Sequence, residues 1–151
     1  LARKEESILS KHGYIWFDSV NKVIFKFENG KAEILSTNIN NLIKSLDIDY
    51  VVFGEDLKTN RLLICIWLNQ TINGNLRNNQ YYITLSYNFN LNDYISLHDY
   101  AFTANYRTYN NSYFFNEKVD IARLYEFDES ETDYKNLASV NNVLYPTIYT
   151  K

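Results

Sequence analysis

The sequence predicts a mainly β fold of antiparallel hairpins, in a propeller-like arrangement or, alternatively, in a β-sandwich, with one short helix near residues 38–46. Three observations predict it. Aromatic and β-branched side chains dominate a series of short runs, which is typical of strands. Turns rich in Asn, Asp and Lys separate these runs. Only one window repeats apolar residues at a helical spacing.

The first hairpin is expected from strands at residues 23–27 and 32–35, with a further strand before it at 14–17. Asn29 and Gly30 stand between the two hairpin strands, and this dipeptide is the strongest short-range signal for a two-residue hairpin loop.

The helix is expected directly after this hairpin. Thr37 is placed to cap its N-terminus. The helix face is predicted from four residues at the i, i+3, i+4, i+7 spacing, namely Ile39, Leu42, Ile43 and Leu46. Upstream, His12 before Gly13 is interpreted as the end of an N-terminal helical turn.

Strand character resumes after the helix and continues through most of the remaining chain. The expected strands are at residues 50–54, 61–68, 81–89, 94–100, 113–115 and 123–127, with a polar loop at 69–80. Residues 128–151 are expected to form an acidic loop and one or two short strands, with Pro146 at an edge or chain end.

Three units share one shape: an aromatic strand, a short polar turn and a second apolar strand. They lie at residues 14–27, 50–68 and 113–127. Repeated aromatic hairpins suggest the blades of a β-propeller. Their spacing is irregular, and a sandwich with Greek-key links produces strands at the same density. Both architectures stay open at this point.

The chain has 151 residues, the usual size of one domain, and contains no methionine. Because a translated protein begins with Met, a chain that starts at Leu1 without any is expected to be processed or cut. We therefore expect residues 1–151 to form a single β-rich domain or a fragment of a larger β-propeller-like protein.

Composition excludes several classes of function. The net charge of −3 and the pI near 5.4 provide no electrostatic footprint for nucleic acid. No apolar stretch approaches the ~18–20 residues of a membrane span. The single cysteine, Cys65, excludes an internal disulfide and lies in an apolar run, where a buried thiol is expected.

No residue pattern indicates catalysis, a cofactor or a metal site. Ser96 and His98 would share one strand face while Asp99 points to the other, so the three cannot form a triad. A polar position hydrogen-bonded to a neighbouring strand is expected there instead. Glu55 and Asp56 are interpreted as turn residues, close enough to Lys58 and Arg61 to be neutralised. The acidic segment 128–133 lacks the glycine of a calcium-binding EF-hand loop.

The surplus of Tyr and Asn suits a binding surface, because rings supply contact area at low entropic cost and amides hydrogen-bond adaptably. The competing explanation is AT-rich coding, which enriches these residues without a functional reason. The predicted contact surface comprises six residues: Tyr100, Tyr106, Tyr109, Asn110, Asn111 and Tyr113.

Several stretches together resemble tail structural proteins of crAss-like tailed bacteriophages. They are Trp16-Phe17-Asp18 with residues 23–31 and the expected helix at 39–46, then 51–56 with 60–63. The closest correspondence is Thr84-Leu85-Ser86-Tyr87-Asn88 leading into Ile95-Ser96-Leu97-His98-Asp99-Tyr100. There the family tends to have Ser-Phe-His-Asp-Tyr. This chain departs from the family with Leu97 in place of the aromatic residue and with Tyr94 in place of a tryptophan. The resemblance extends from Tyr14 to about Phe127.

The resemblance implies a non-enzymatic part of the tail nozzle or muzzle, located in the virion. Its partners would be identical copies and other virion proteins, joined in a ring by protein–protein contacts. The alternative, from a different class, is a stand-alone acidic protein-binding domain, such as an immunity or anti-defence protein, which would be cytoplasmic. An acidic, compact β-rich domain suits a basic partner. A carbohydrate-binding module is a third possibility.

Overall fold

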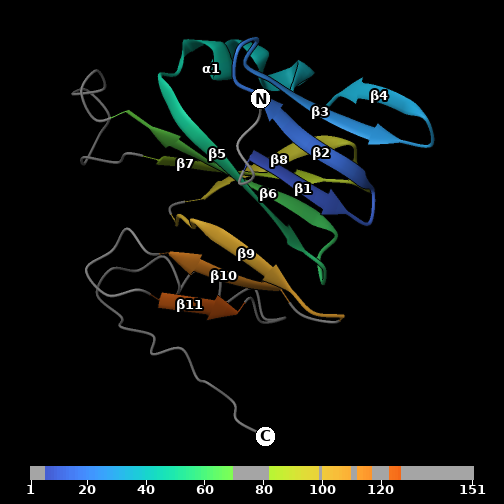
Figure 1. Cartoon of the computed structure of the whole chain (residues 1–151), viewed down its shortest axis with the longest axis vertical. Helices are drawn as coiled ribbons and strands as arrows, with labels where there is room; N and C mark the ends of the chain where they lie inside the picture. Colours follow the sequence, from blue (N-terminus) through green and yellow to red (C-terminus); the bar gives the residue numbers. More distant parts are fainter. Residues whose placement is uncertain (1–5, 70–81, 99, 110–111, 117–122, 127–151) are drawn as a thin grey trace, which may run out of the picture.

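The computed structural model describes residues 6–69, 82–98, 100–109, 112–116 and 123–126. In these ranges the chain forms three antiparallel sheets, here called A, B and C, with one short α-helix (Figure 1). The prediction of a mainly β fold with antiparallel hairpins and a short helix is therefore confirmed.

Sheet A contains four strands in sequence order: β1 (Ser7–Ser10), β2 (Gly13–Asp18), β3 (Val23–Glu28) and β4 (Lys31–Ile34). The β3–β4 hairpin turns at Asn29 and Gly30, as their sequence predicts. Their φ angles of 52° and 76° lie in the left-handed region that a type I′ loop requires.

The N-terminal helical turn is a wrong prediction, because β1 occupies this place. Ser10 pairs with Gly13 across a tight turn, and Leu9 pairs with Tyr14 of β2. His12 lies in that turn, where its ring stacks on Phe89 with centroids 3.9 Å apart. The strand is short and is defined by its pairing with β2 rather than by its own pattern.

The helix α1 (Asn40–Ser45) follows a 3₁₀ turn at Thr37–Ile39. Thr37 does not cap α1, contrary to the prediction. Its hydroxyl instead donates to the backbone carbonyl of Ile34 over 3.3 Å, and the N-cap residue of α1 is Ile39. Of the predicted apolar face, Ile43 and Leu46 are buried and Ile39 packs against the same core, whereas Leu42 is 37% exposed.

Sheet B also contains four strands in sequence order: β5 (Ile48–Asp56), β6 (Arg61–Leu68), β7 (Tyr82–Asn88) and β8 (Asp93–His98). β6 lies inside the sheet, and all seven residues from Leu62 to Leu68 are buried.

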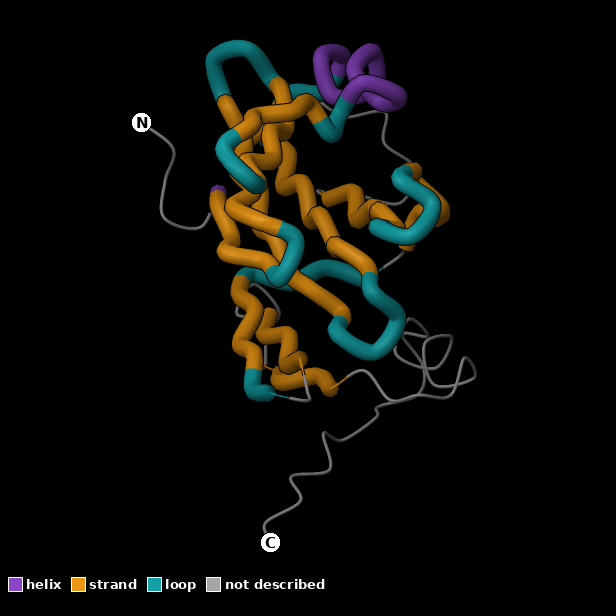
Figure 2. The backbone as a smooth tube through the Cα atoms, turned by 90° about the vertical axis from the view of Figure 1, so that its right-hand side faces the viewer, coloured by secondary structure: helices purple, strands orange, loops and turns teal. Residues whose placement is uncertain are grey.

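Sheet C is smaller, with the order β11–β10–β9. Its strands are β9 (Ala104–Arg107), β10 (Ser112–Asn116) and β11 (Arg123–Glu126). β9 was not predicted, because only four residues pair and they read as a polar, mixed segment. Sheet C lies at the end of the molecule opposite to α1 (Figure 2).

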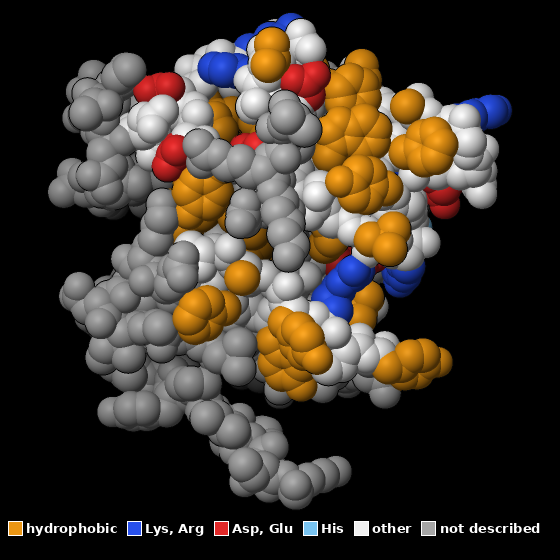
Figure 3. Space-filling model, in the orientation of Figure 1, with side chains coloured by type: hydrophobic (Ala, Val, Ile, Leu, Met, Phe, Trp, Pro, Cys, Tyr) orange, Lys and Arg blue, Asp and Glu red, His pale blue; other side chains and the backbone are white. Residues whose placement is uncertain are grey.

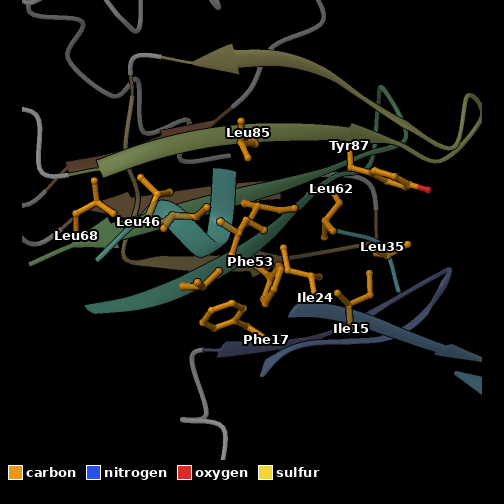
Figure 4. Close-up of a cluster of buried hydrophobic side chains, with 14 residues drawn as sticks. Ile15, Phe17, Ile24, Leu35, Leu46, Phe53, Leu62, Leu68, Leu85 and Tyr87 are labelled. Atoms are coloured by element: carbon orange, nitrogen blue, oxygen red, sulfur yellow. The ribbon is translucent and has the colours of Figure 1, made fainter. Parts of the chain in front are cut away.

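Two hydrophobic cores cover the two faces of sheet B. The first lies between sheets A and B, where side chains from both sheets point toward one another (Figure 4). It includes Ile15, Phe17, Ile24, Ile43, Val51, Phe53, Leu62, Ile64, Ile66 and Leu85. The second core joins the other face of sheet B to sheet C and the segment before it. It comprises Val52, Leu63, Cys65, Trp67, Ala101, Phe102 and Phe114. Cys65 is buried, as predicted.

The three repeated units are antiparallel hairpins, namely β2–β3, β5–β6 and β10–β11. Each belongs to a different sheet, and over the described residues the sheets form neither a propeller nor a closed barrel. The face-to-face packing of sheets A and B matches the sandwich alternative instead. The expectations for residues 70–80 and 128–151 lie outside the described residues.

Gly54 of β5 makes the second core possible. A Cβ atom at this position would lie 2.3 Å from Phe114 Cε1 and 3.2 Å from Phe102 Cε2, both rings being fully buried. We expect Gly54→Ala to lower the free energy of unfolding by about 1–3 kcal/mol through overpacking, measured by urea denaturation.

The matched control is Gly30→Asn. Gly30 has no atom within 4 Å of the added Cβ, and Asn tolerates its left-handed backbone. A Gly54→Ala variant as stable as Gly30→Asn would contradict this account of the core.

Candidate interaction surfaces

The structure places Tyr106 and Tyr113 on adjacent strands of sheet C and Tyr109 beyond the end of β9. Tyr106 of β9 lies directly across from Tyr113 of β10, with ring centroids 6.4 Å apart. Tyr106 is 68% exposed, and Tyr109 beyond the strand end is 97% exposed. Tyr106, Tyr109 and Tyr113 are here called the tyrosine cluster of sheet C.

The other predicted contact residues do not join this cluster. Tyr100 is half-buried, packs against the second core, and lies with its ring 4.9 Å from that of His98. Asn110 and Asn111 lie outside the described residues.

A larger apolar surface lies on the outer face of sheet A. The inward positions of β2 and β3, such as Ile15, Phe17 and Ile24, enter the first core. Successive strand residues point to opposite faces, so the alternate residues face outward. The strand register aligns these outward residues in two rows across the four strands. One row is Leu9, Tyr14, Phe27 and Ala32, and the other is Ser7, Trp16, Phe25 and Ile34.

This surface, here called the aromatic face, carries no charged side chain in either row. Leu9 is 69% exposed, Ile34 51%, Phe27 47% and Tyr14 44%. The half-buried Trp16 stacks between Tyr14 and Phe25, with centroid distances of 5.7 and 5.2 Å. Figure 3 shows hydrophobic side chains gathered on the part of the surface that β1 to β4 occupy.

The size of the aromatic face indicates what kind of contact it suits. Four strands ~4.8 Å apart, with about four residues each at ~3.3 Å, cover on the order of 300 Å² in projection. An apolar patch of this order is often functional on a monomer. A standard protein–protein interface buries about 800 Å² on each partner. The face therefore has the extent of an interface's apolar centre, to which a polar rim would be added.

The sequence contained a signal for this surface. In residues 14–17 and 23–27 nearly every position is apolar or aromatic, rather than every second one. Such a run predicts a strand that is apolar on both faces. The surplus of Tyr and Asn predicted a contact surface at residues 100–113 instead, because residue type alone does not show which face of a strand is apolar.

A buried carboxylate joins the three sheets near the end of β5. Glu55 is fully buried and accepts a hydrogen bond from Ser10 Oγ of β1 over 2.8 Å. Its other carboxylate oxygen pairs with the Arg107 guanidinium of β9, which also donates to the Leu9 carbonyl of β1. The Ser112 hydroxyl of β10 donates to the Glu55 carbonyl. This cluster connects all three sheets at a single side chain.

The interpretation of Glu55 and Asp56 as turn residues neutralised by Lys58 and Arg61 is therefore partly wrong, because Glu55 is buried within β5. Lys58 does not neutralise Glu55, because the ion pair is formed with Arg107, 52 positions away in the sequence. Asp56 does shape the turn, since its carboxylate accepts from the backbone N–H groups of Lys58 and Thr59 over 3.1 and 3.4 Å. The carboxylates of Glu55 and Asp56 are therefore both hydrogen-bonded or ion-paired within the fold.

Ser96 and His98 share one face of β8, as predicted, and Asp99 lies outside the described residues. Ser96 Oγ lies 2.6 Å from Ser86 Oγ on the neighbouring strand and 3.1 Å from His98 Nε2. The prediction of a polar position hydrogen-bonded to an adjacent strand is confirmed for Ser96. Its hydroxyl is shared between two protein groups.

Over the described ranges, no group of three or more His, Cys, Asp and Glu side chains is arranged to hold a metal ion. No helix among the same residues is long and apolar enough to cross a membrane.

Comparison with known proteins does not assign the chain to a family. No protein-family model and no curated protein matches the chain. The two apolar surfaces and the contacts between sheets therefore carry the functional argument.

Tyr94 illustrates how burial perturbs a titratable group without creating a reactive site. Its hydroxyl is buried and has no hydrogen-bond partner within the described part of the chain. Desolvation by burial, with smaller contributions from Tyr87 and Asp93, raises the pKa of this phenol far above its usual value of 10.0. The ring packs edge-on against Tyr87 with centroids 5.2 Å apart.

We expect Arg107→Leu to lower the free energy of unfolding by about 3–5 kcal/mol, because it leaves the buried Glu55 carboxylate without its cation. Glu55→Gln keeps a polar partner for Ser10 and should cost less, about 1–3 kcal/mol. Both values are measured by urea denaturation. Lys58→Leu is the control and should change stability by less than about 0.5 kcal/mol. An equal loss in the Lys58 and Arg107 variants would contradict the assigned pair.

Tyr94→Phe tests the buried phenol through pH. A raised pKa in the folded state means that the stabilisation is complete below the unfolded pKa of 10.0 and is lost as the pH rises above it. We expect wild-type protein to lose stability above about pH 10, and Tyr94→Phe to lose less. Denaturation between pH 8 and 11 measures the difference. Tyr109→Phe, at a 97% exposed position, is the control and should follow the wild type.

Proposed function

We propose that this chain is a non-enzymatic structural protein that assembles through protein–protein contacts, with the aromatic face of sheet A at the centre of its contact surface. The observation that carries the proposal is the pair of uncharged rows across β1 to β4, with four side chains between 44% and 69% exposed. Interface centres are enriched in Tyr, Trp and Phe and depleted of charge.

The polar clusters support an architectural role. Glu55 and Arg107 connect sheets, and the Trp67 indole donates to the Phe102 carbonyl over 3.0 Å between sheet B and the segment leading to sheet C. Ser96 is hydrogen-bonded within sheet B. Each of these polar groups forms a contact between elements of the fold, and we assign none of them a catalytic role.

The setting we propose is the distal tail of a crAss-like tailed bacteriophage, as part of the nozzle or muzzle. The resemblance of residues 14–127 to such proteins supports this setting. The chain would then reside in the virion and bind identical copies and other virion proteins. An antibody against the chain should label the tail tip of purified virions in electron micrographs, and absence of the protein from virions would refute this setting.

The alternative is a stand-alone acidic protein-binding domain of the immunity or anti-defence type, acting in the cytoplasm. The net charge of −3 supports this alternative, because an acidic surface suits a basic partner. Charge-driven binding weakens steeply with ionic strength, whereas apolar contact does not. A partner that dissociates on raising the salt to about 1 M would favour the alternative.

The contact surface is tested by substituting Leu9, Tyr14 and Phe27 together with Thr. Threonine keeps β propensity and removes apolar area. We expect at least a roughly tenfold loss in self-association or partner binding, since truncated interface centres commonly cost ~2 kcal/mol or more. Sedimentation velocity and negative-stain microscopy provide the measurement.

The competing surface supplies the matched control. Tyr106, Tyr109 and Tyr113 are replaced by Thr in a second triple variant, which removes the tyrosine cluster of sheet C. Loss of assembly in this variant alone would transfer the contact surface to sheet C. Wild-type assembly in both variants would refute the proposal for each surface.

A further inference from the structure

The β4 strand forms an open edge of sheet A. Among the described strands it pairs with β3 alone, and all four of its residues are exposed. The β3–β4 hairpin lies at the outer margin of the molecule (Figure 1). An edge strand of this kind presents backbone donors and acceptors to another chain.

The register shows which backbone groups of β4 point outward. Leu35 N–H donates to the Ile24 carbonyl over 2.9 Å, so residues 24 and 35 form a hydrogen-bonded pair. Such pairs alternate along an antiparallel ladder. Lys26 with Glu33 and Glu28 with Lys31 are then hydrogen-bonded pairs, and the N–H and carbonyl groups of Ala32 point away from β3.

We propose that β4 pairs antiparallel with β4 of a second copy of this chain, centred on Ala32 in both copies. This inference rests on the proposed assembly function and names one of its interfaces. The two Ala32 residues exchange two backbone hydrogen bonds. On the face opposite to the aromatic face, Lys31 of each copy lies across from Glu33 of the second copy.

The outward backbone groups of β4 allow several antiparallel registers between two copies. The charges of Lys31 and Glu33 favour the register centred on Ala32. A shift that centres the pairing on Glu33 places two carboxylates opposite each other, which is destabilising. A shift that centres it on Ile34 leaves both charges without an opposite partner on the facing strand. Only the Ala32 register brings opposite charges together twice. Glu33 Oε1 already lies 2.6 Å from Lys26 Nζ of the same copy. The Glu33 side chain is nevertheless 57% exposed and therefore accessible to Lys31 of the second copy.

Short and charged edge strands often prevent pairing. In β4 the two charges have opposite signs and stand two positions apart around an alanine, so antiparallel self-pairing attracts rather than repels. The paired sheets would form one continuous sheet of eight strands, four from each copy. Phe27 and Ala32 of both copies then lie side by side, which extends the aromatic face across the two-fold axis.

Disulfide trapping tests the register. In the proposed pair the two Ala32 Cα atoms lie ~5.5 Å apart, within the range for a disulfide. Ala32→Cys should form a covalent dimer under mild oxidation. Ile34→Cys is the matched control, because each Ile34 lies opposite Gly30 of the second copy, ~13 Å along the strand from the other Ile34. Native Cys65 is fully buried and remains in both variants. Equal trapping at both positions, or trapping only at 34, would overturn the register.

Ala32→Pro tests the pairing without any cross-link. It removes an N–H group that points away from β3, so the hairpin keeps its own hydrogen bonds. We expect the dimer of the wild type to weaken by ~10-fold or more, measured by sedimentation equilibrium. Ala32→Val is the control, since it retains the N–H group and favours a strand.

The outcomes separate this inference from the proposed function. A monomeric wild type, or a dimer that Ala32→Pro leaves intact, overturns the β4 pairing. Partner binding or higher assembly that persists in Ala32→Pro but is lost in the Leu9, Tyr14 and Phe27 variant would leave the aromatic face as the contact surface. If assembly persists in both the Ala32→Pro variant and the Leu9, Tyr14 and Phe27 variant, the β4 pairing and the proposed contact surface are both overturned.

Discussion

Burial of the central strands on both faces is the constraint on which the rest of the structure depends. β6 carries seven consecutive buried residues from Leu62 to Leu68. Since neighbouring side chains of a strand point in opposite directions, Leu62, Ile64 and Ile66 enter one core and Leu63, Cys65 and Trp67 enter the other. Each fully buried aliphatic side chain contributes about 1.5–3 kcal/mol relative to exposure. Sheet B therefore requires a cover on each face, which sheets A and C provide.

The two covers are attached differently. Sheet A packs over a broad apolar area together with α1, whereas sheet C depends on two fully buried phenylalanine rings and on polar bridges to sheet B. Glu55 supplies the bridge that involves all three sheets. A buried ion pair contributes little net stability but is costly to break, so it favours one arrangement of the sheets over others.

The aromatic face follows from the same layered arrangement. Tyr14 to Phe17 of β2 are apolar on both faces of the strand, and sheet B covers only one face of sheet A. In the interior of a layered protein such a sheet would have a second neighbour. The charges of the β3–β4 hairpin, Lys26 with Glu28 and Glu33, lie on the face opposite to the aromatic rows. The two outer rows are thereby left free of charge, as the centres of protein–protein interfaces commonly are.

Local chemistry in the sequence determined the hairpins, the Asn29–Gly30 turn, the buried Cys65 and the mainly β class, because alternation and turn preference act over a few residues. Short strands such as β1 and β9 escaped prediction, since pairing with neighbours defines them more than their own pattern does. Only the tertiary structure decided which hairpins share a sheet, that Arg107 rather than Lys58 pairs with Glu55, and which face of β2 and β3 stays uncovered. Those outcomes depend on contacts between residues tens of positions apart, and no local periodicity encodes them.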